Sequence, residues 1–330
     1  MKSALVKILI IVVILSLTVS LLSACGKATE NEDETTDSVT TEEPTTEAVV
    51  TEEPTTESVT TEPATEAQTE YDFSGAASSQ LQKIAKKIAM SDNYLIFTVG
   101  DSVTQGQQAS NPKTTDYTAM FTKKLCEVFP EKSVFRCDGV AISNDSSGKW
   151  TNVNFAGVAK RGVRIQTGNS GEITVARCGL GGDTVAKVIN RTDDFVNKEL
   201  RGQTAKLITI CLGINDSWPS TNVSPEEYKG QLSVLIDKIY EGQPDVDIIL
   251  MTPTYITDNN TRPLVDYATA MKELAVSRDL AYIDLNAMFN ENYAKSNPED
   301  WLADNCHPND AGYNAIANEM IRCLFGIELE

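Results

Sequence analysis

The stretch "YLIFTVGDSVTQG", residues 94–106, joins a run of apolar, β-forming residues to a glycine-bounded turn that carries Ser102. Its hydrophobicity is nearly continuous, which is typical of a strand buried on both faces of a parallel sheet. Four further runs have the same character and lie at 172–179, 206–213, 246–252 and 280–285. Helix-like patterns separate or follow these runs at 115–129, 183–200, 225–241, 262–279 and from about 309. The alternation predicts a parallel sheet with helices on both faces, in which a ligand binds outside the carboxyl ends of the strands.

The interval 130–171 interrupts this alternation. It is rich in Gly, Asn and Ser and contains only short β-like pieces. It therefore predicts an inserted hairpin or small sheet between the first two strands. Such a β-rich segment either decorates the sheet edge or forms a flap that shapes a pocket, and the sequence leaves both possibilities open.

Residues 1–25 have the pattern of an export signal. Lys2 and Lys7 flank the start of an uncharged apolar run at 8–22, which small residues follow. "LSAC" at 22–25 resembles a bacterial lipobox, in which the signal is cut before the cysteine and that cysteine receives lipid. We therefore expect a lipid on Cys25 to hold the protein on the outer face of a bacterial cytoplasmic membrane. An uncleaved anchor helix is the alternative, although the run is short for a span of about 20 residues.

The segment 26–70 reads as a disordered tether. From residue 28 onward it has fourteen Asp or Glu and no Lys or Arg, and "TEEPTTE" occurs at 41–47 and again at 51–57. Such a composition has too little apolar surface to offset the entropy of ordering the chain. Whether the threonines carry glycans cannot be decided from composition.

Residues 71–330 are long enough for one α/β domain with a buried core. The tether accounts for most of the net charge of −19, so this domain is only mildly acidic, with 33 acids against 25 bases. A domain of this charge lacks the basic patch by which proteins bind nucleic acid. Nucleic acid is therefore excluded as a partner, and other long polyanions are poor candidate substrates.

The six cysteines after Cys25 have no C-x-x-C spacing, which argues against a zinc knuckle or a redox pair. Cys178 and Cys211 lie in apolar runs and are expected to pack in the core. Cys126 and Cys137 are the nearest pair, and an exported protein permits a disulfide between them, a possibility that stays open.

Three glycine-containing turns follow the first three predicted strands: "GDSVTQG" at 100–106, "GLGGDT" at 179–184 and "LGIND" at 212–216. Taken alone, each has an ordinary explanation. Ser102 could be only a helix cap. The second turn lacks the G-x-G-x-x-G spacing of a dinucleotide site. Asn215 in the third could be present only because asparagine is common in turns.

His307, the only histidine in the chain, lies in "DNCHP" just before the last predicted helix. A serine hydroxyl needs a base to take its proton, and His307 is the only imidazole available to Ser102. Asp304, three residues earlier, can orient that imidazole. The backbone N–H groups of Ser102 and Gly182 and the side-chain amide of Asn215 are a candidate set of donors for an oxyanion.

The four blocks, in this order, resemble those of the SGNH hydrolases, also called GDSL-type esterases: Ser102 in G-D-S, Gly182 in G-G-D-T, Asn215 in G-x-N-D and His307 in D-x-x-H-P. The likeness spans roughly residues 94–325. It implies a three-layer, flavodoxin-like α/β fold with a five-stranded parallel sheet. It also implies hydrolysis of esters or thioesters without metal or cofactor.

Carried onto this sequence, the resemblance makes Ser102 the nucleophile, His307 the base and Asp304 its orienter, with Gly182 and Asn215 in the oxyanion hole. The single histidine also excludes zinc hydrolases and metal-dependent deacetylases that need two or three His ligands. Cys306 beside His307 could suggest Cys–His chemistry. We expect their side chains to point apart, because they are neighbours on an extended segment.

Trp218 and Trp301 lie near these blocks and could line a crevice for sugar rings, or could simply pack. An exported esterase suits an acylated polysaccharide, and we expect a carbohydrate O-deacetylase. The alternatives are a lipase- or thioesterase-type acylhydrolase, an esterase of envelope polymers, and a surface-anchored binding module without catalysis. The acyl group, the alcohol and the oligomeric state stay open, and the 130–171 insertion weakens any substrate inference from relatives.

Overall fold

A computed structural model describes residues 71–138, 140–144, 150–155, 162–258, 260–295 and 300–329. The predicted signal, the lipid-bearing Cys25 and the tether lie outside these residues, so their predictions are untested. In the described ranges no helix has both the length and the hydropathy to cross a membrane.

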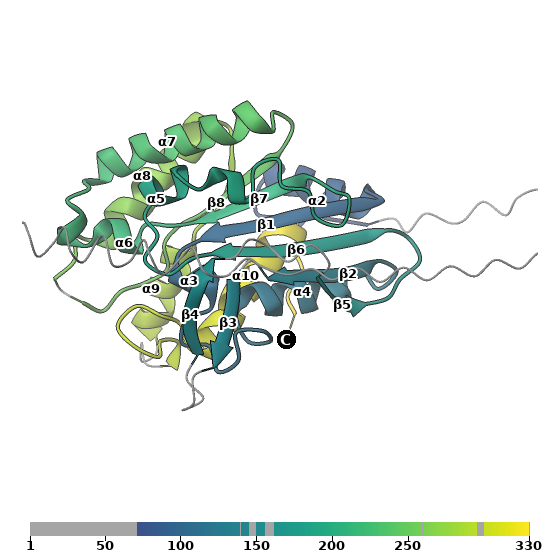
Figure 1. Ribbon diagram of the computed structural model, residues 1–330, viewed down its shortest axis with the longest axis horizontal. Helices are drawn as coiled ribbons and strands as arrows, with labels where there is room; N and C mark the ends of the chain where they lie inside the picture. The colour runs from purple at the N-terminus through teal and green to yellow at the C-terminus, as the bar shows by residue number, and fades with distance from the viewer. Residues whose placement is uncertain are drawn as a thin grey trace, which may run out of the picture. The chain divides into compact units, whose positions relative to one another are not determined.

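The main sheet has seven strands in the order β5-β2-β6-β1-β7-β8-β9 (Figure 1). Six of them are parallel, and only β5, at the edge beside β2, is antiparallel to its neighbour. The strands are β1 (Asn93–Gly100), β2 (Ser133–Asp138), β5 (Val163–Gln166), β6 (Glu172–Gly179), β7 (Ala205–Cys211), β8 (Asp247–Met251) and β9 (Ala281–Ile283). The predicted parallel sheet is confirmed, with β1 at its centre. The predicted number of five strands is wrong.

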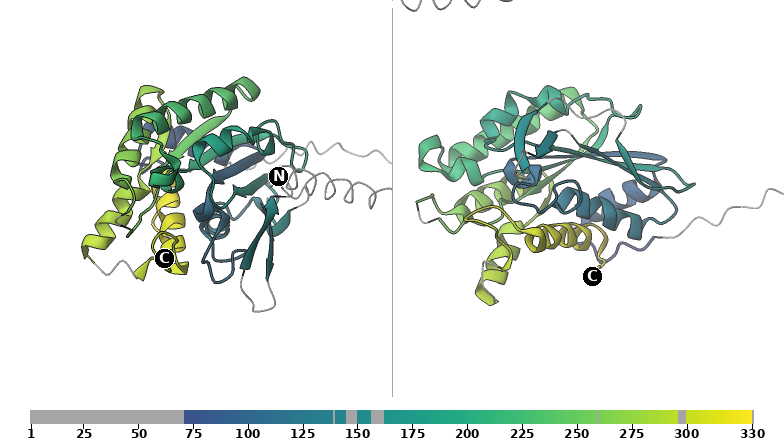
Figure 2. Two further views of the ribbon diagram at one scale, coloured as in Figure 1. Left: turned by 60° about the vertical axis from the view of Figure 1, so that its left-hand side comes forward. Right: turned by 60° about the horizontal axis from the view of Figure 1, so that its bottom comes forward.

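Both additional strands come from the interval 130–171. β2 and β5 extend the main sheet, and only β3 (Val140–Asn144) and β4 (Trp150–Phe155) form a separate antiparallel hairpin (Figures 1 and 2). The predicted β-rich insertion is present, and β2 and β5 match one of the two possibilities that the sequence left open, decoration of the sheet edge. The sequence did not show that β2 joins the main sheet, because Arg136 interrupts its apolar pattern, although that arginine is itself buried.

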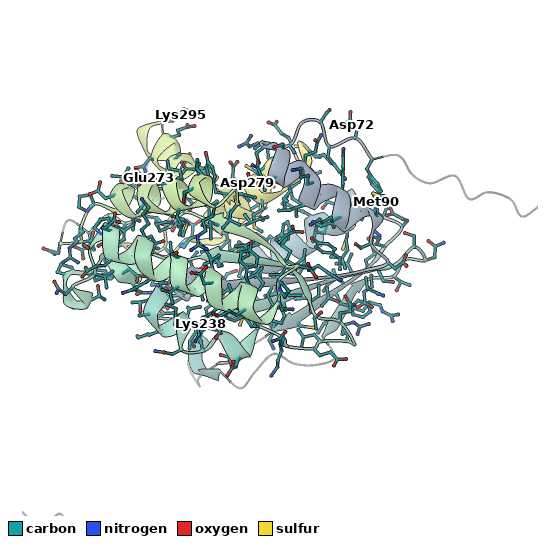
Figure 3. The ribbon with its side chains drawn as sticks, turned by 90° about the horizontal axis from the view of Figure 1, so that it is seen from above. Asp72, Met90, Lys238, Glu273, Asp279 and Lys295 are labelled. Carbon is teal, nitrogen blue, oxygen red and sulfur yellow. The ribbon has the colours of Figure 1, made fainter. Side chains whose placement is uncertain are left out.

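Helices cover both faces of the sheet and produce three layers. One buried cluster joins the sheet to α2 (Ser79–Met90), α4 (Tyr117–Val128), α9 (Leu285–Lys295) and α10 (Asp310–Phe325). The other joins it to α5 (Val185–Ile189), α7 (Pro225–Gly242) and α8 (Leu264–Ser277). On that second face Lys229 of α7 pairs with Glu273 of α8 at 2.8 Å. Figure 3 labels Glu273 on this helix.

The helix predictions hold for α4, α7, α8 and α10 and fail for 183–200. That segment contains the short α5, a 3-10 turn η1 (Thr192–Asp194) and irregular backbone. Its polar run "NRTDD" competes for backbone hydrogen bonds, and Asn197 adopts a left-handed φ of 55°. The sequence analysis did not predict α2 or α9. The remaining short elements are α3 (Ser102–Gln105), α6 (Ile214–Ser217) and a 3-10 turn η2 (Pro219–Thr221).

A buried charge cluster fixes the loop 106–116, which follows Ser102. The Asp116 carboxylate accepts from Arg136 at 2.5 Å and from Arg177 at 2.8 Å, and all three side chains are at most 4% exposed. Both arginines also donate to the carbonyl of Pro112, at 3.1 and 3.0 Å. Because buried charges must be paired, this cluster leaves the loop little freedom to move.

We predict that Asp116→Asn lowers the free energy of unfolding by about 3–5 kcal/mol, because it removes the fully buried carboxylate that both guanidinium groups share. Only Asp138, which is 30% exposed and lies 3.1 and 3.3 Å from the two arginines, is then left to balance their charge. The amide oxygen still permits the cap on the N–H of Ala119 that Asp116 provides. Asp237→Asn removes the partner of Arg278 in a solvent-exposed pair and is the matched control, with an expected loss of at most about 1 kcal/mol. Urea denaturation measures both values. Equal losses would contradict the account.

Candidate active site

Ser102 lies at the carboxyl end of β1, in a turn that only a glycine permits. A Cβ on Gly100 would lie 2.1 Å from Oγ1 of Thr104 and 2.5 Å from the carbonyl oxygen of Cys211. The Asp101 carboxylate then caps the four-residue helix α3 by accepting from the N–H of Val103 at 2.9 Å. The chain therefore turns directly from strand to helix, and Ser102 stays 6% exposed.

The segment 301–309 carries His307 to this turn. It is closed at its base by a β-bridge between Leu302 and Pro308 and by the N–H of Asn309, which donates to the carbonyl of Trp301 at 2.9 Å. α10 begins directly after it, capped by the Asn309 side chain. The segment is thus a tight loop held between α9 and α10.

Ser102, His307 and Asp304 form one hydrogen-bonded chain. Nε2 of His307 lies 2.9 Å from Oγ of Ser102, 205 residues away in the sequence, and Nδ1 lies 2.8 Å from Oδ2 of Asp304. A carboxylate only accepts, so Nδ1 carries the ring proton and Nε2 accepts from the serine hydroxyl. The grouping that the sequence predicted is present.

Asp304 is held in its orientation by several donors. Its Oδ1 accepts from the backbone N–H groups of Cys306 at 2.9 Å and His307 at 2.7 Å, and Oδ2 also accepts from Nε2 of Gln108 at 3.1 Å. Burial raises the pKa of this carboxyl, but these N–H groups and the imidazole outweigh burial and hold the pKa below its usual value. Gln108, which adopts a left-handed φ of 68°, is a contact that sequence reasoning missed.

Further contacts connect the loop 106–116 to the start of α10. The Asp310 carboxylate accepts from the N–H of Ser110 at 2.8 Å and from the hydroxyl of Thr115 at 2.9 Å, and the Tyr313 hydroxyl donates to the carbonyl of Gln107 at 2.6 Å. The segment after the serine and the helix after the histidine are therefore fastened together.

The turns that contain Gly182 and Asn215 follow β6 and β7, the strands on either side of β1. Gly182 has φ of 80°, which favours glycine, and Asn215 lies in α6 just after β7. Nδ2 of Asn215 donates to the carbonyl of Asp183 at 2.9 Å, which joins the two turns. This amide keeps a second hydrogen, and within the described part of the chain the N–H groups of Ser102 and Gly182 make no hydrogen bond. Three donors are thus available around the turn.

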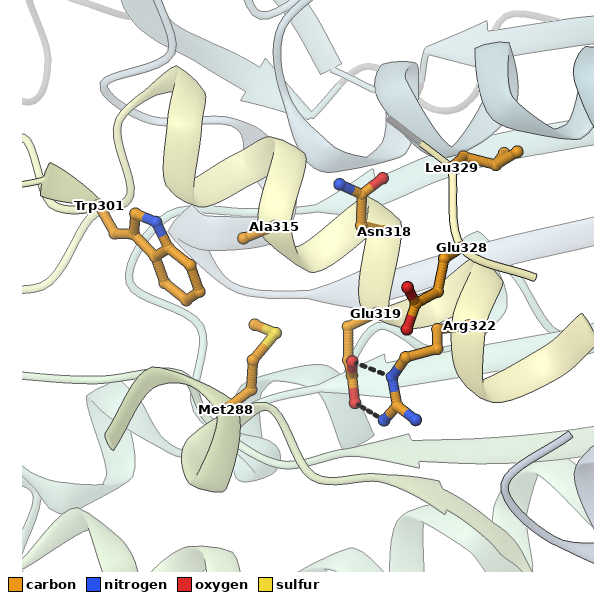
Figure 4. A pocket seen from close by; sticks show the side chains of 8 residues that line it. All are labelled: Met288, Trp301, Ala315, Asn318, Glu319, Arg322, Glu328 and Leu329. Carbon is orange, nitrogen blue, oxygen red and sulfur yellow. Dashed lines mark hydrogen bonds and ion pairs between the residues drawn. The ribbon is translucent and has the colours of Figure 1, made fainter. Parts of the chain in front are cut away.

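The predicted role of the two tryptophans in lining a substrate crevice stays a prediction. Trp218 ends α6 and is half-buried. Trp301 packs edge-to-face on Phe289, with ring centroids 5.2 Å apart, and lines a separate pocket beside α10 (Figure 4).

Cys306 corrects the expectation that its side chain points away from His307. Its sulfur lies 3.5 Å from Nδ1 and 3.9 Å from Nε2. Both ring nitrogens already have partners, since Nδ1 bonds to Asp304 and Nε2 to Ser102. Asp304, Cys306 and His307 lie close enough to be compared with a metal ligand set, but the engagement of both ring nitrogens does not fit one.

The other cysteines in the part of the chain that the structure describes form no disulfide. Cys126 and Cys137, the pair for which a disulfide stayed open, are both free, and Cys178 and Cys211 are buried in the core as expected.

Three buried carboxyl groups lie behind the turns. Burial raises the pKa of Asp101 to about 7 and that of Asp216 to about 6, and the neighbouring carboxylates add to both shifts. Burial also raises the pKa of Asp183, although Arg191 beside it, at 2.6 Å, opposes the change. Arg191 donates in addition to the carbonyl of Cys178 at 3.0 Å, so it ties the Asp183 turn to the end of β6.

The sequence model of the GDSL-like Lipase/Acylhydrolase family matches residues 98–315, which include all five predicted catalytic and oxyanion-hole residues. An acetylxylan esterase of Geobacillus stearothermophilus is 29% identical over 163 residues, covering 46% of this chain and 71% of that protein.

Two solved structures are similar in fold. Axe2, an acetylxylan esterase from Geobacillus stearothermophilus, is 25% identical and covers 71% of this chain and 95% of its own, with a TM-score of 0.51. LAE5, an alpha/beta hydrolase enzyme from the metagenome of Lake Arreo in Spain, is 21% identical and covers 70% and 96%, with a TM-score of 0.50.

The raised pKa of Asp101 generates a prediction for stability. Between its ordinary value of 3.8 and about 7, the unfolded chain loses this proton while the folded protein keeps it. The stability that this carboxyl contributes therefore falls as the pH rises through that window. Asp101→Asn should raise the melting temperature relative to the parent by several degrees at pH 8 and by less at pH 5, since 1 kcal/mol corresponds to about 2–4 °C. Differential scanning calorimetry at both pH values checks this. A melting-temperature difference between variant and parent that is the same at pH 5 and pH 8 would refute it.

Proposed function

The chain belongs to the GDSL-like lipase/acylhydrolase family and is a carboxylic ester hydrolase, and on this premise we propose that it removes O-acetyl groups from a polysaccharide by a Ser-His-Asp mechanism. The observation that carries the mechanism is the hydrogen-bonded chain from Ser102 through His307 to Asp304, at 2.9 and 2.8 Å.

In the first half of the proposed reaction, Oγ of Ser102 attacks the ester carbonyl while Nε2 of His307 takes the hydroxyl proton. Asp304, whose pKa is held low, remains charged and stabilises the imidazolium that forms. The negative charge on the carbonyl oxygen is met by the N–H groups of Ser102 and Gly182 and by the Asn215 amide. When the tetrahedral intermediate collapses, the imidazolium protonates the departing alcohol and leaves an acyl group on the serine.

In the second half, water attacks the acyl-enzyme and gives its proton to His307. Collapse of this intermediate returns that proton to Oγ of Ser102 and releases the carboxylic acid. Every proton in this cycle moves through one imidazole. The presence of a single histidine in the chain is therefore no obstacle to the reaction.

The polysaccharide part of the proposal rests on the relatives. The relative found by sequence and the solved structure of Axe2 are both named acetylxylan esterases, and this chain covers 71% of the first and 95% of the second. They support an acetylated carbohydrate as the substrate class. The mildly acidic charge of residues 71–330 agrees with a neutral polymer, since an anionic one would be repelled.

The proposal also includes location. We propose that the chain is exported, that Cys25 carries lipid after removal of the signal, and that residues 26–70 tether a catalytic domain at 71–330 to the outer face of the membrane. The support is the lipobox-like "LSAC" and the acidic, Thr-rich composition that follows it.

We predict Ser102-dependent release of acetate from both 4-nitrophenyl acetate and acetylated xylan. Ser102→Ala should abolish turnover with little effect on folding. Asp304→Asn should reduce turnover less than Ser102→Ala does, because the base and the nucleophile are still present. A decanoate ester tests the lipase alternative in the same assay. Hydrolysis of the decanoate without release from acetylated xylan would overturn the polysaccharide proposal and keep the hydrolase. A kinetically silent Asp304→Asn would show that another group orients His307.

We further predict that Cys25→Ala prevents lipid attachment when the full-length chain is expressed in a bacterium. The parent should appear in the membrane fraction and incorporate labelled palmitate, and the variant should do neither. Incorporation of label by the variant would place the lipid on another residue.

A further inference from the structure

A pocket of about 320 Å³ lies on the outer side of α10 (Figure 4). It is lined by Met288, Trp301, Ala315, Asn318, Glu319, Arg322, Glu328 and Leu329. Its volume falls in the range of about 300–1,000 Å³ that small-molecule sites occupy. Neither Ser102 nor His307 lines it, so it is distinct from the active site.

The two ends of this pocket differ in chemistry. Figure 4 shows the indole of Trp301 at one end, and the polar side chains of Asn318, Glu319 and Arg322 toward the other. The contact with Phe289 fixes the indole ring. Glu319 and Arg322 hold each other through two hydrogen bonds, at 2.8 and 2.6 Å. A flat apolar face and an ordered polar edge are thus already in place.

One polar group in the wall of the pocket has an unused hydrogen-bond acceptor. Oδ1 of Asn318 accepts no hydrogen bond from the residues that the structure describes, and in this orientation it has almost no surface open to the pocket. Because an unpaired buried acceptor is costly, rotation of this half-buried side chain toward a hydroxyl of a bound molecule would give that oxygen a donor.

The charges of the pocket narrow the class of molecule. Glu319 and Glu328 contribute two carboxylates against the one guanidinium of Arg322, so an anion such as a phosphate or an acidic sugar would be repelled. A long acyl chain needs an apolar lining along its whole length, which the polar end does not provide. A sugar ring fits, because it has an apolar C–H face for the indole and hydroxyl edges for the polar groups.

We propose that this pocket binds backbone sugar units of a neutral polysaccharide, as a second contact for the polymer beyond the active site. The inference rests on the proposed function and adds to it a way of holding the chain. Trp301 begins the loop 301–309 that also carries Asp304 and His307. A polymer held against Trp301 is therefore bound by the same loop that presents the catalytic groups.

The test uses the full-length chain with Ser102→Ala, so that acetylated ligands are not consumed. Calorimetric titration with xylohexaose and with acetylated xylan should show binding that Arg322→Ala or Asn318→Ala weakens by about tenfold, the effect of one lost hydrogen bond to a charged or buried group. Arg278→Ala, which breaks an exposed arginine–carboxylate pair on the opposite helical layer, is the matched control and should bind like the parent. Trp301→Ala is informative only if its melting temperature is near that of the parent, because Trp301 also packs on the core.

With the catalytic serine restored, kcat/KM is measured on acetylated xylan and on 4-nitrophenyl acetate. In Arg322→Ala the ratio of the first value to the second should fall, because KM for acetylated xylan rises. In Arg278→Ala this ratio should stay at the parent value. If Ser102-dependent release from xylan is intact but neither binding nor this ratio changes in Arg322→Ala and Asn318→Ala, the pocket inference is wrong and the proposed function stands. If the parent releases no acetate from xylan and binds no xylohexaose, both fail.

Discussion

The hydrogen bond between Nε2 of His307 and Oγ of Ser102 is the contact on which the rest of the site depends. Its partners are 205 residues apart, one at the end of the central strand and the other in a loop before the last helix. A separation of 2.9 Å across such a distance in sequence requires further contacts that fasten the two segments to each other. Contacts from Gln108 to Asp304 and from Tyr313 to the loop after the serine do this.

The arrangement of the catalytic turn requires several charged groups to be buried. Asp116 and two arginines immobilise the loop behind the serine, and Asp101 and Asp216 are buried where their pKa values rise. A buried carboxyl that must ionise near neutral pH destabilises the folded state. The turn that exposes the serine hydroxyl to the imidazole is therefore built at the expense of stability, as expected where a site constrains the fold.

The sequence predicted the parts of the fold that depend on local patterns. Three of the four blocks were found because each follows an apolar strand, and those strand ends meet at one edge of a parallel sheet. The fourth was found because it contains the only histidine in the chain. β2 was recognised only as a short β-like piece, because buried Arg136 reads as a surface residue, and the helix at 183–200 was overextended because periodicity does not reveal where polar residues end it. Gln108 and the pocket beside Trp301 depend on contacts between segments that are distant in sequence, which no local pattern encodes. The contact of the Cys306 sulfur with His307 joins neighbours, and it was missed because the segment 301–309 is a tight loop and not extended backbone.

The central claim is that Ser102 is a nucleophile activated by His307, and covalent labelling tests it most directly. The full-length chain is incubated with diethyl 4-nitrophenyl phosphate, which acylation-competent serines capture, and the digest is analysed by mass spectrometry. The account predicts one phosphorylated peptide, the one that contains Ser102, and its absence from the His307→Asn variant. An unlabelled Ser102 in the parent, or equal labelling in the variant, would contradict it.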